Sequence, residues 1–205
     1  MRRSRGFFLP QPDNAEELFT LAVTLGGVIT RMFRKTGHTE LSCEPVIEKK
    51  TIIEFMRRMR VFGMEKFATP TFISTVNYYA NSKDLQEHRA LGAIIIYIEQ
   101  GFVANLLRLL QYPMIDDDDD EAMKDACGTL CNVIAGQFKA EIAKLGFVEL
   151  EMSHFSNYRN TAFHGVEFSS SQRQKYELSF DIQDKKRLVV EMTMGPLPKL
   201  KSKNE

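Results

Sequence analysis

The segment EAMKDACGTLCNVIAGQFKAEIAKL, residues 121–145, carries the clearest helical pattern in the sequence and decides the fold. Its apolar residues recur every three or four positions, a spacing that gathers side chains on one face of an α-helix. They are Met123, Ala126, Cys127, Leu130, Val133, Ile134, Phe138, Ile142 and Leu145. An aspartate run, residues 116–120, precedes the segment, and acidic side chains at a helix N-terminus cap free N–H groups and complement the helix dipole. We therefore predict a helix over residues 117–145 that is buried along one stripe.

A second set of residues lies on the face of this helix that points away from the apolar stripe. Asp125, Thr129, Asn132 and Gly136 follow one another at spacings of 4, 3 and 4 residues, so they stack into a short column on the helix surface. Gly128 and Gly136 each cost roughly 1 kcal/mol relative to alanine inside a helix. That cost indicates close approach by another element of the chain or by a partner, so we look for function on this helix.

The rest of the chain alternates between helical and extended patterns. Apolar periodicity predicts further helices over residues 13–35, 51–60 and 101–111. Runs rich in β-branched and aromatic residues, or alternating in polarity, predict extended segments over residues 40–48, 71–79, 91–99, 147–154, 175–181 and 187–194. Residues 183–186 between the last two are expected to form a hairpin turn. The order of a helix and three strands occurs twice, joined by a helix, which indicates an α+β fold with an internal duplication.

Composition limits the class of protein. A chain of 205 residues with 43% hydrophobic and 26% charged residues is suited to one globular domain. We expect that domain over residues 13–195, with flexible tails at 1–12 and 196–205. Lys plus Arg and Asp plus Glu both number 27, so we expect neither nucleic acid nor a membrane as a partner. The absence of a signal-like segment and three cysteines in no paired spacing favour a cytoplasmic location.

The order Asp125-x3-Thr129-x2-Asn132-x3-Gly136 resembles the active helix of the CheC/CheX/FliY family, phosphatases that act on the phosphorylated response regulator of bacterial chemotaxis. In that family an acidic or serine residue precedes a glutamate by four positions, an asparagine follows three later, and small residues with a glycine come next. Asp125, Asn132 and Gly136 match the first residue, the asparagine and the glycine. Thr129 stands at the glutamate position, so the chain departs from the pattern at one of the two residues used for chemistry.

The resemblance also covers the overall fold. The family packs two long helices on an antiparallel sheet built as a repeat, and residues 13–194 are compatible with that plan. The first helix takes the place of the second active helix of the family. Its corresponding segment, residues 21–27, has neither the glutamate nor the asparagine, so we interpret that copy as degenerate.

The resemblance implies a phosphorylated CheY-like response regulator as the partner. Its receiver domain would bring the aspartyl phosphate and Mg²⁺, so we expect no cofactor belonging to this chain. Phosphoryl transfer depends mainly on positioning and electrostatics, and an amide offers a donor and an acceptor without charge, so Asn132 is expected to orient the attacking water. Thr129 accepts a hydrogen bond but supplies no charge, and Asp125 is the carboxylate one turn away. Gly128 and Gly136 are assigned to the contact surface.

Two interpretations remain open, a weak aspartyl-phosphate phosphatase and a non-catalytic module for binding or dimerisation. An unrelated enzyme acting on a small molecule would instead need a deep pocket lined by titratable groups. Exposed strand edges favour a homodimer. Cys127 and Cys131 are interpreted as buried apolar residues, and the aspartate run as a solvated helix start rather than a cation site, because consecutive carboxylates do not converge on one point. His154 and His164 fit no catalytic motif.

Overall fold

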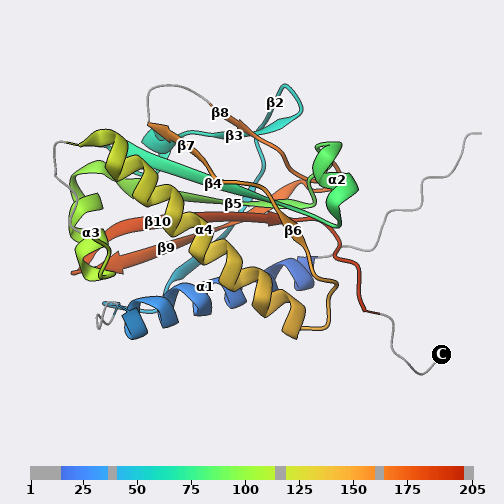
Figure 1. Cartoon of the computed structure of the whole chain (residues 1–205), viewed down its shortest axis with the longest axis horizontal. Helices are drawn as coiled ribbons and strands as arrows, with labels where there is room; N and C mark the ends of the chain where they lie inside the picture. The colour runs from blue at the N-terminus through green and yellow to red at the C-terminus, as the bar shows by residue number, and fades with distance from the viewer. Residues whose placement is uncertain (1–14, 37–40, 114–118, 160–163, 201–205) are drawn as a thin grey trace, which may run out of the picture.

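Two long helices cover one face of an antiparallel sheet in the computed structural model of the protein (Figure 1). The structure describes residues 15–36, 41–113, 119–159 and 164–200. Helix α1 is Ala15–Thr36 and helix α4 is Asp120–Lys144, so both predicted long helices are confirmed. Most of the predicted stripe of α4 is buried against the sheet, and Leu130, Ile134 and Phe138 are each 0% exposed, whereas Val133 and Leu145 of the same stripe are 38% and 48% exposed. The aspartates at positions 116–118 lie outside the described residues.

The main sheet has seven strands in the order β1-β9-β10-β5-β4-β6, with β7 also paired to β4. The strands are β1 Val46–Thr51, β4 Thr71–Tyr79, β5 Gly92–Glu99, β6 Glu151–Met152, β7 Ser156–Arg159, β9 Gln174–Ile182 and β10 Lys185–Met194. The strand order is symmetric about the contact between β10 and β5. On the two sides of that contact, β10 corresponds to β5, β9 corresponds to β4 and β1 corresponds to β7. The predicted α+β fold is confirmed, and this strand order fits the predicted duplication.

A small sheet covers part of the other face of the main sheet. It consists of β2 Glu54–Phe55, β3 Arg58–Val61 and β8 His164–Val166, in the order β2-β3-β8. Alternate residues of the central strands point to this side, and they form a second apolar cluster with the small sheet. Its buried members are Met59, Val61, Phe67, Ile73, Ala93, Ile95, Tyr97, Val166 and Val189.

A buried group of charged side chains lies on the same side of the main sheet. Glu191 is 0% exposed, and its carboxylate lies 2.6 Å from the Nζ atoms of both Lys66 and Lys175. Tyr97 donates a 2.8 Å hydrogen bond to Glu191, and Lys66 also pairs with Glu177. Because each buried carboxylate has cationic partners, the group avoids the cost of an unpaired buried charge.

The predicted helix over residues 51–60 is wrong. These residues form β2, a turn at Met56–Arg57 and β3, and both turn residues have positive φ, 50° and 61°. The helical spacing of apolar residues misled the prediction because they do not share a buried face. Met59 packs under the main sheet, whereas Phe55 and Met56 are exposed. In β3 the buried residues alternate at the strand period instead.

The segment between α4 and β9 differs from the prediction. Of the expected strand over residues 147–154, only β6 is a strand, while β7 and β8 follow where no strand was predicted. β7 has the sequence SNYR and pairs with β4 through its backbone, so it carries no apolar signal. The apolar side chains of Phe147 and Leu150 pack into the core beneath the helices without a continuous strand.

The remaining elements are short. Predicted strands 71–79 and 91–99 are β4 and β5, and the capped helix α2, Ser82–Gln86, lies between them. The predicted helix over 101–111 is a 3₁₀ turn, η2 Gln100–Phe102, followed by α3, Val103–Leu109; a second such turn, η1, is Gly63–Glu65. The expected hairpin joins β9 to β10 through Gln183 and Asp184, both at positive φ. Of the expected C-terminal tail, residues 196–200 pack on the body through Leu197, which is 6% exposed. No described helix is long and apolar enough to cross a membrane.

Candidate functional site on helix α4

The outer face of α4 carries the column that the sequence predicted. Asp125, Thr129 and Asn132 are exposed, and Gly136 is partly exposed, because the buried stripe of the same helix faces the sheet. Within the described residues, the side chains of Asp125, Thr129 and Asn132 form no hydrogen bond. A free carboxylate, a hydroxyl and an amide are therefore available together on about two turns of helix.

The two helix glycines have different surroundings. A Cβ atom added to Gly128 would lie 2.5 Å from the ring of Phe155 and 2.6 Å from Nδ2 of Asn157, so the element that approaches it is the chain's own β7 region. Gly128 is buried and lies outside the exposed column. A Cβ added to Gly136 would meet nothing within 4 Å. Gly136 is thus the glycine that leaves the helix surface bare.

Helix α4 is fixed to the sheet by polar contacts as well as by its apolar stripe. Tyr78 of β4, which is fully buried, donates a 2.9 Å hydrogen bond to the carbonyl oxygen of Ala135. At the N-terminus Asp119 caps the helix by accepting a hydrogen bond of 2.9 Å from the N–H of Ala122, and Asp120 forms an ion pair with Arg159 of β7. These contacts fix the rotation of α4 about its own axis, so the face that carries Asn132 points toward solvent.

The equivalent face of α1 has no such column. Its exposed residues include Phe19 and Val23, each 48% exposed. The hydroxyl groups of Thr20 and Thr24 are hydrogen-bonded to backbone carbonyls of their own helix, at 3.0 and 2.8 Å. Of the two long helices, α4 therefore carries the column of polar side chains without hydrogen-bond partners among the described residues, in agreement with the interpretation of α1 as the degenerate copy.

The cysteines of α4 are part of the core. Cys127 and Cys131 are 1% and 0% exposed, and burial raises the pKa of the Cys127 thiol to about 12. The prediction that they act as buried apolar residues is confirmed. Within the described residues, no group of three or more His, Cys, Asp or Glu side chains is placed to hold a metal ion.

A small polar pocket of about 190 Å³ lies on the other face of the sheet, between β4 and the small sheet. At its centre the Glu167 carboxylate accepts hydrogen bonds of 3.1 Å from Arg58 and from Tyr79, and lies 3.3 Å from His88. Burial, together with the charge of Glu167, raises the pKa of Tyr79 to about 12. His154 lines this pocket as well, whereas the side chain of His164 lies outside the described part of the chain. The pocket is separated from α4 by the sheet, so it plays no part in the α4 site.

The family model for the chemotaxis phosphatase CheX matches residues 85–163. This segment contains the whole of α4 and hence all of Asp125, Thr129, Asn132 and Gly136. No curated protein sequence matches the chain.

Solved structures of chemotaxis proteins share the fold. A putative chemotaxis protein from Desulfovibrio vulgaris Hildenborough superposes with a TM-score of 0.57 at 15% identity, covering 85% of this chain and 96% of that one. CheX from Vibrio vulnificus gives a TM-score of 0.56 at 13% identity, covering 84% of this chain and 97% of that one. FliY from Thermotoga maritima gives 0.57 at 12% identity, covering 90% and 91%.

The fold is therefore that of the CheC/CheX/FliY chemotaxis proteins. Residues 85–163 match the CheX family model, and the resemblance predicted from the sequence is confirmed.

The sequence identified the column on α4 but not the residues that hold α4 against the sheet. Phe155 and Asn157, which pack against Gly128, stand in a polar segment with no periodic signal. Tyr78 lies in a strand that was predicted correctly, but its hydrogen bond to Ala135 depends on how α4 crosses the sheet. The spacing of residues along the chain carries no information on that crossing.

Proposed function

We propose that this protein binds the phosphorylated receiver domain of a CheY-like response regulator through the exposed face of α4. The observation that supports it is the set of exposed side chains on one helix face, within the segment that matches the CheX family model. Asp125, Thr129 and Asn132 have no hydrogen-bond partners among the described residues, so they are available to a partner.

In this proposal Asn132 has the chemical role. Its amide accepts a hydrogen bond from the attacking water and donates one toward the phosphoryl group, which places the water in line with the aspartyl phosphate. The receiver supplies the aspartyl phosphate and Mg²⁺, so the chain contributes position rather than a cofactor. Gly136, with open space above it, allows the receiver surface to approach the helix backbone one turn beyond Asn132.

Thr129 makes the proposed hydrolysis slow. The family places a glutamate here, and a carboxylate would pair with a cation of the receiver, whereas a hydroxyl only accepts a hydrogen bond. Asp125 lies one turn earlier on the same face, and in this proposal its shorter side chain substitutes for that carboxylate only in part, from a displaced position. Replacing Thr129 with glutamate should therefore raise the rate if the missing charge limits hydrolysis.

The test is phosphate release from a phosphorylated chemotaxis receiver domain with wild-type protein, Asn132→Ala and Thr129→Glu. Acceleration by the wild type that Asn132→Ala abolishes supports the catalytic proposal. Asn105→Ala on α3 is the matched control, and it should behave as wild type. A wild type that neither binds the receiver nor accelerates release contradicts the proposed function.

The alternative function is a non-catalytic module, and the threonine at position 129 is the observation that favours it. Binding of the receiver without acceleration, unchanged in Asn132→Ala, would establish this alternative. A homodimer is part of either version. The edge strand β1, whose outer backbone groups have no partner strand in the described sheet, is the surface we propose for it.

A further inference from the structure

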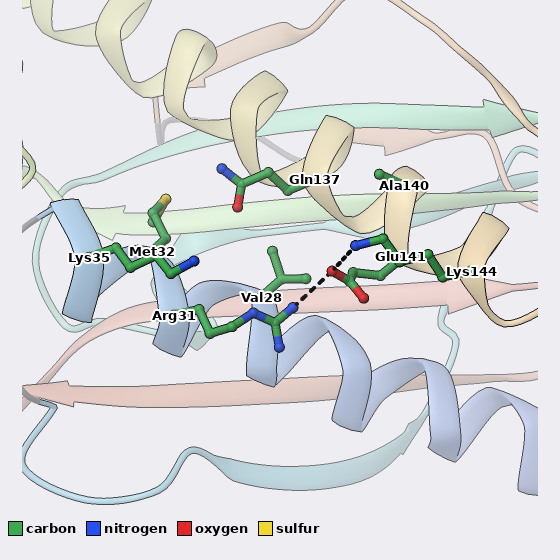
Figure 2. Close-up of a pocket in the computed structure, with 8 residues that line it drawn as sticks. All are labelled: Val28, Arg31, Met32, Lys35, Gln137, Ala140, Glu141 and Lys144. Atoms are coloured by element: carbon green, nitrogen blue, oxygen red, sulfur yellow. Dashed lines mark hydrogen bonds and ion pairs between the residues drawn. The ribbon is translucent and has the colours of Figure 1, made fainter.

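A groove opens between α1 and α4, one turn beyond Gly136 (Figure 2). It has a volume of about 320 Å³. Its floor is apolar, formed by the buried side chains of Val28 and Met32 of α1. Polar side chains from both helices stand around the floor, among them Gln137 of α4, and Ala140 also lines the α4 side.

The rim of the groove carries more positive than negative charge. It has three cations, Arg31, Lys35 and Lys144, and a single carboxylate, Glu141. One oxygen of Glu141 lies 3.2 Å from Nη2 of Arg31 and 3.1 Å from Nζ of Lys144. Lys35 has no ion-pair partner among the residues that the structure describes, and Figure 2 shows its side chain beside Met32, away from Glu141. The groove therefore has the charge to accept an anion.

The helix surface between the column and this groove carries only very small side chains. Beyond Asn132 the next residues on the same face are Gly136 and Ala140, which have no side chain or a single methyl group. Ala140 lies eight residues after Asn132, which corresponds to about 12 Å along a helix. A folded domain is much wider than this, so one seated over Asn132 is large enough to reach the groove as well.

We propose that this groove receives an acidic side chain of the docked receiver domain, about 12 Å from its phosphorylated aspartate along the α4 axis. This inference rests on the proposed function and adds a determinant of partner choice to it. An aspartate or glutamate fits because its carboxylate pairs with Lys35 and Arg31 while its methylene groups cover Met32. Charged pairs at the rim of an interface contribute to association rate and specificity, so the groove selects among receivers.

Glu141 competes with the incoming carboxylate. The hydrogen bond from Lys144, together with the charges of Lys144 and Arg31, holds the pKa of Glu141 below its ordinary value, so it remains ionised at neutral pH. Its removal frees two cations for the receiver. Variants of Lys35 and Glu141 therefore change affinity in opposite directions.

The test measures binding of the phosphorylated receiver, and KM and kcat for phosphate release, in 50 mM and 300 mM salt. Lys35→Glu should weaken binding by about 10-fold at low salt, with kcat unchanged, and Glu141→Gln should strengthen it by about 3-fold. Arg34→Glu is the matched control, because Arg34 is exposed on the same helix, does not line the groove and makes the same change of charge. It should alter binding by less than 2-fold.

Equal losses of receiver binding in Lys35→Glu and Arg34→Glu would contradict the proposal that the groove binds an acidic side chain. The proposed function would remain intact, because the wild type would still bind the receiver. A wild type without any binding would overturn both. Weaker binding in Glu141→Gln would also count against the groove, since it would show that Glu141 itself contacts the receiver.

Discussion

The hydroxyl group of Tyr78 in β4 and the carbonyl oxygen of Ala135 in α4 are joined by a buried hydrogen bond of 2.9 Å. Ala135 stands on the inner side of the helix between Asn132 and Gly136, so this bond fixes the part of α4 that carries the proposed site. The ring of Tyr78 also packs edge-on against Phe138, with centroids 6.1 Å apart. Both contacts therefore fix the rotation of α4 about its own axis relative to the sheet.

Tyr78→Phe should lower the free energy of unfolding by about 1 kcal/mol, because it removes one buried hydrogen bond and keeps the ring. Urea denaturation measures the change. Tyr112→Phe is the control, since the Tyr112 hydroxyl has no hydrogen-bond partner among the described residues. A loss in Tyr78→Phe no larger than in Tyr112→Phe would show that the bond does not contribute to stability.

Gly136→Ala and Gly128→Ala should have opposite effects on stability. Alanine at position 136 meets nothing within 4 Å and should raise the free energy of unfolding by up to about 1 kcal/mol. Alanine at position 128 collides with Phe155 and should cost about 1–3 kcal/mol. Thermal unfolding of the two variants checks this. Receiver binding by Gly136→Ala should nevertheless weaken, and tighter binding would contradict the close approach proposed there.

A thiol reagent should modify one cysteine of the native protein quickly. Cys43 is exposed, whereas Cys127 and Cys131 are buried, and burial raises the pKa of Cys127 to about 12. Reaction with an aromatic disulfide at pH 8 should therefore show one fast thiol, which Cys43→Ser removes. The other two should react only as fast as the protein unfolds. Rapid reaction of all three in native conditions would contradict the packing of α4 on the sheet.

Glu177 should make stability depend on pH in the acid range. Burial alone would raise its pKa, but hydrogen bonds and charges from Lys50 and Lys66 outweigh burial and hold the pKa below the ordinary value of 4.5. A carboxyl whose pKa is lower in the folded state stabilises the protein above its unfolded pKa, and this stabilisation disappears as the pH falls through the folded value.

Glu177→Gln should therefore be about 2 kcal/mol less stable at pH 7, with a smaller further loss below pH 4.5 than the wild type. Denaturant titrations at several pH values provide the measurement. Glu44→Gln, at an exposed position without an ion-pair partner in the described structure, should follow the wild-type curve. Parallel pH profiles for wild type and Glu177→Gln would show that Glu177 titrates normally.

The sequence predicted the elements whose signal is local. The apolar stripe of α4, the strands β4 and β5 and the turn at Gln183–Asp184 each follow from spacing or residue type over a few turns or residues. Residues 51–60 were predicted wrongly because Met59 is buried by the main sheet, a contact that spacing cannot reveal. The column was predictable because its residues lie on one helix, α4. The groove beside it was not, because it forms between two helices. Two of its three cations, Arg31 and Lys35, come from α1, and nothing in the sequence shows which turn of α1 lies against α4.

The strand order has a consequence for folding during synthesis. The pair β9–β10 lies between β1 and β5, so the first half of the chain cannot close its part of the sheet by itself. β10 is the last strand in the described chain and also a central one. On the ribosome, β1 must therefore wait until β9 and β10 have emerged before it can join the sheet. Such late, long-range pairing favours slow folding and dependence on chaperones for the emerging chain.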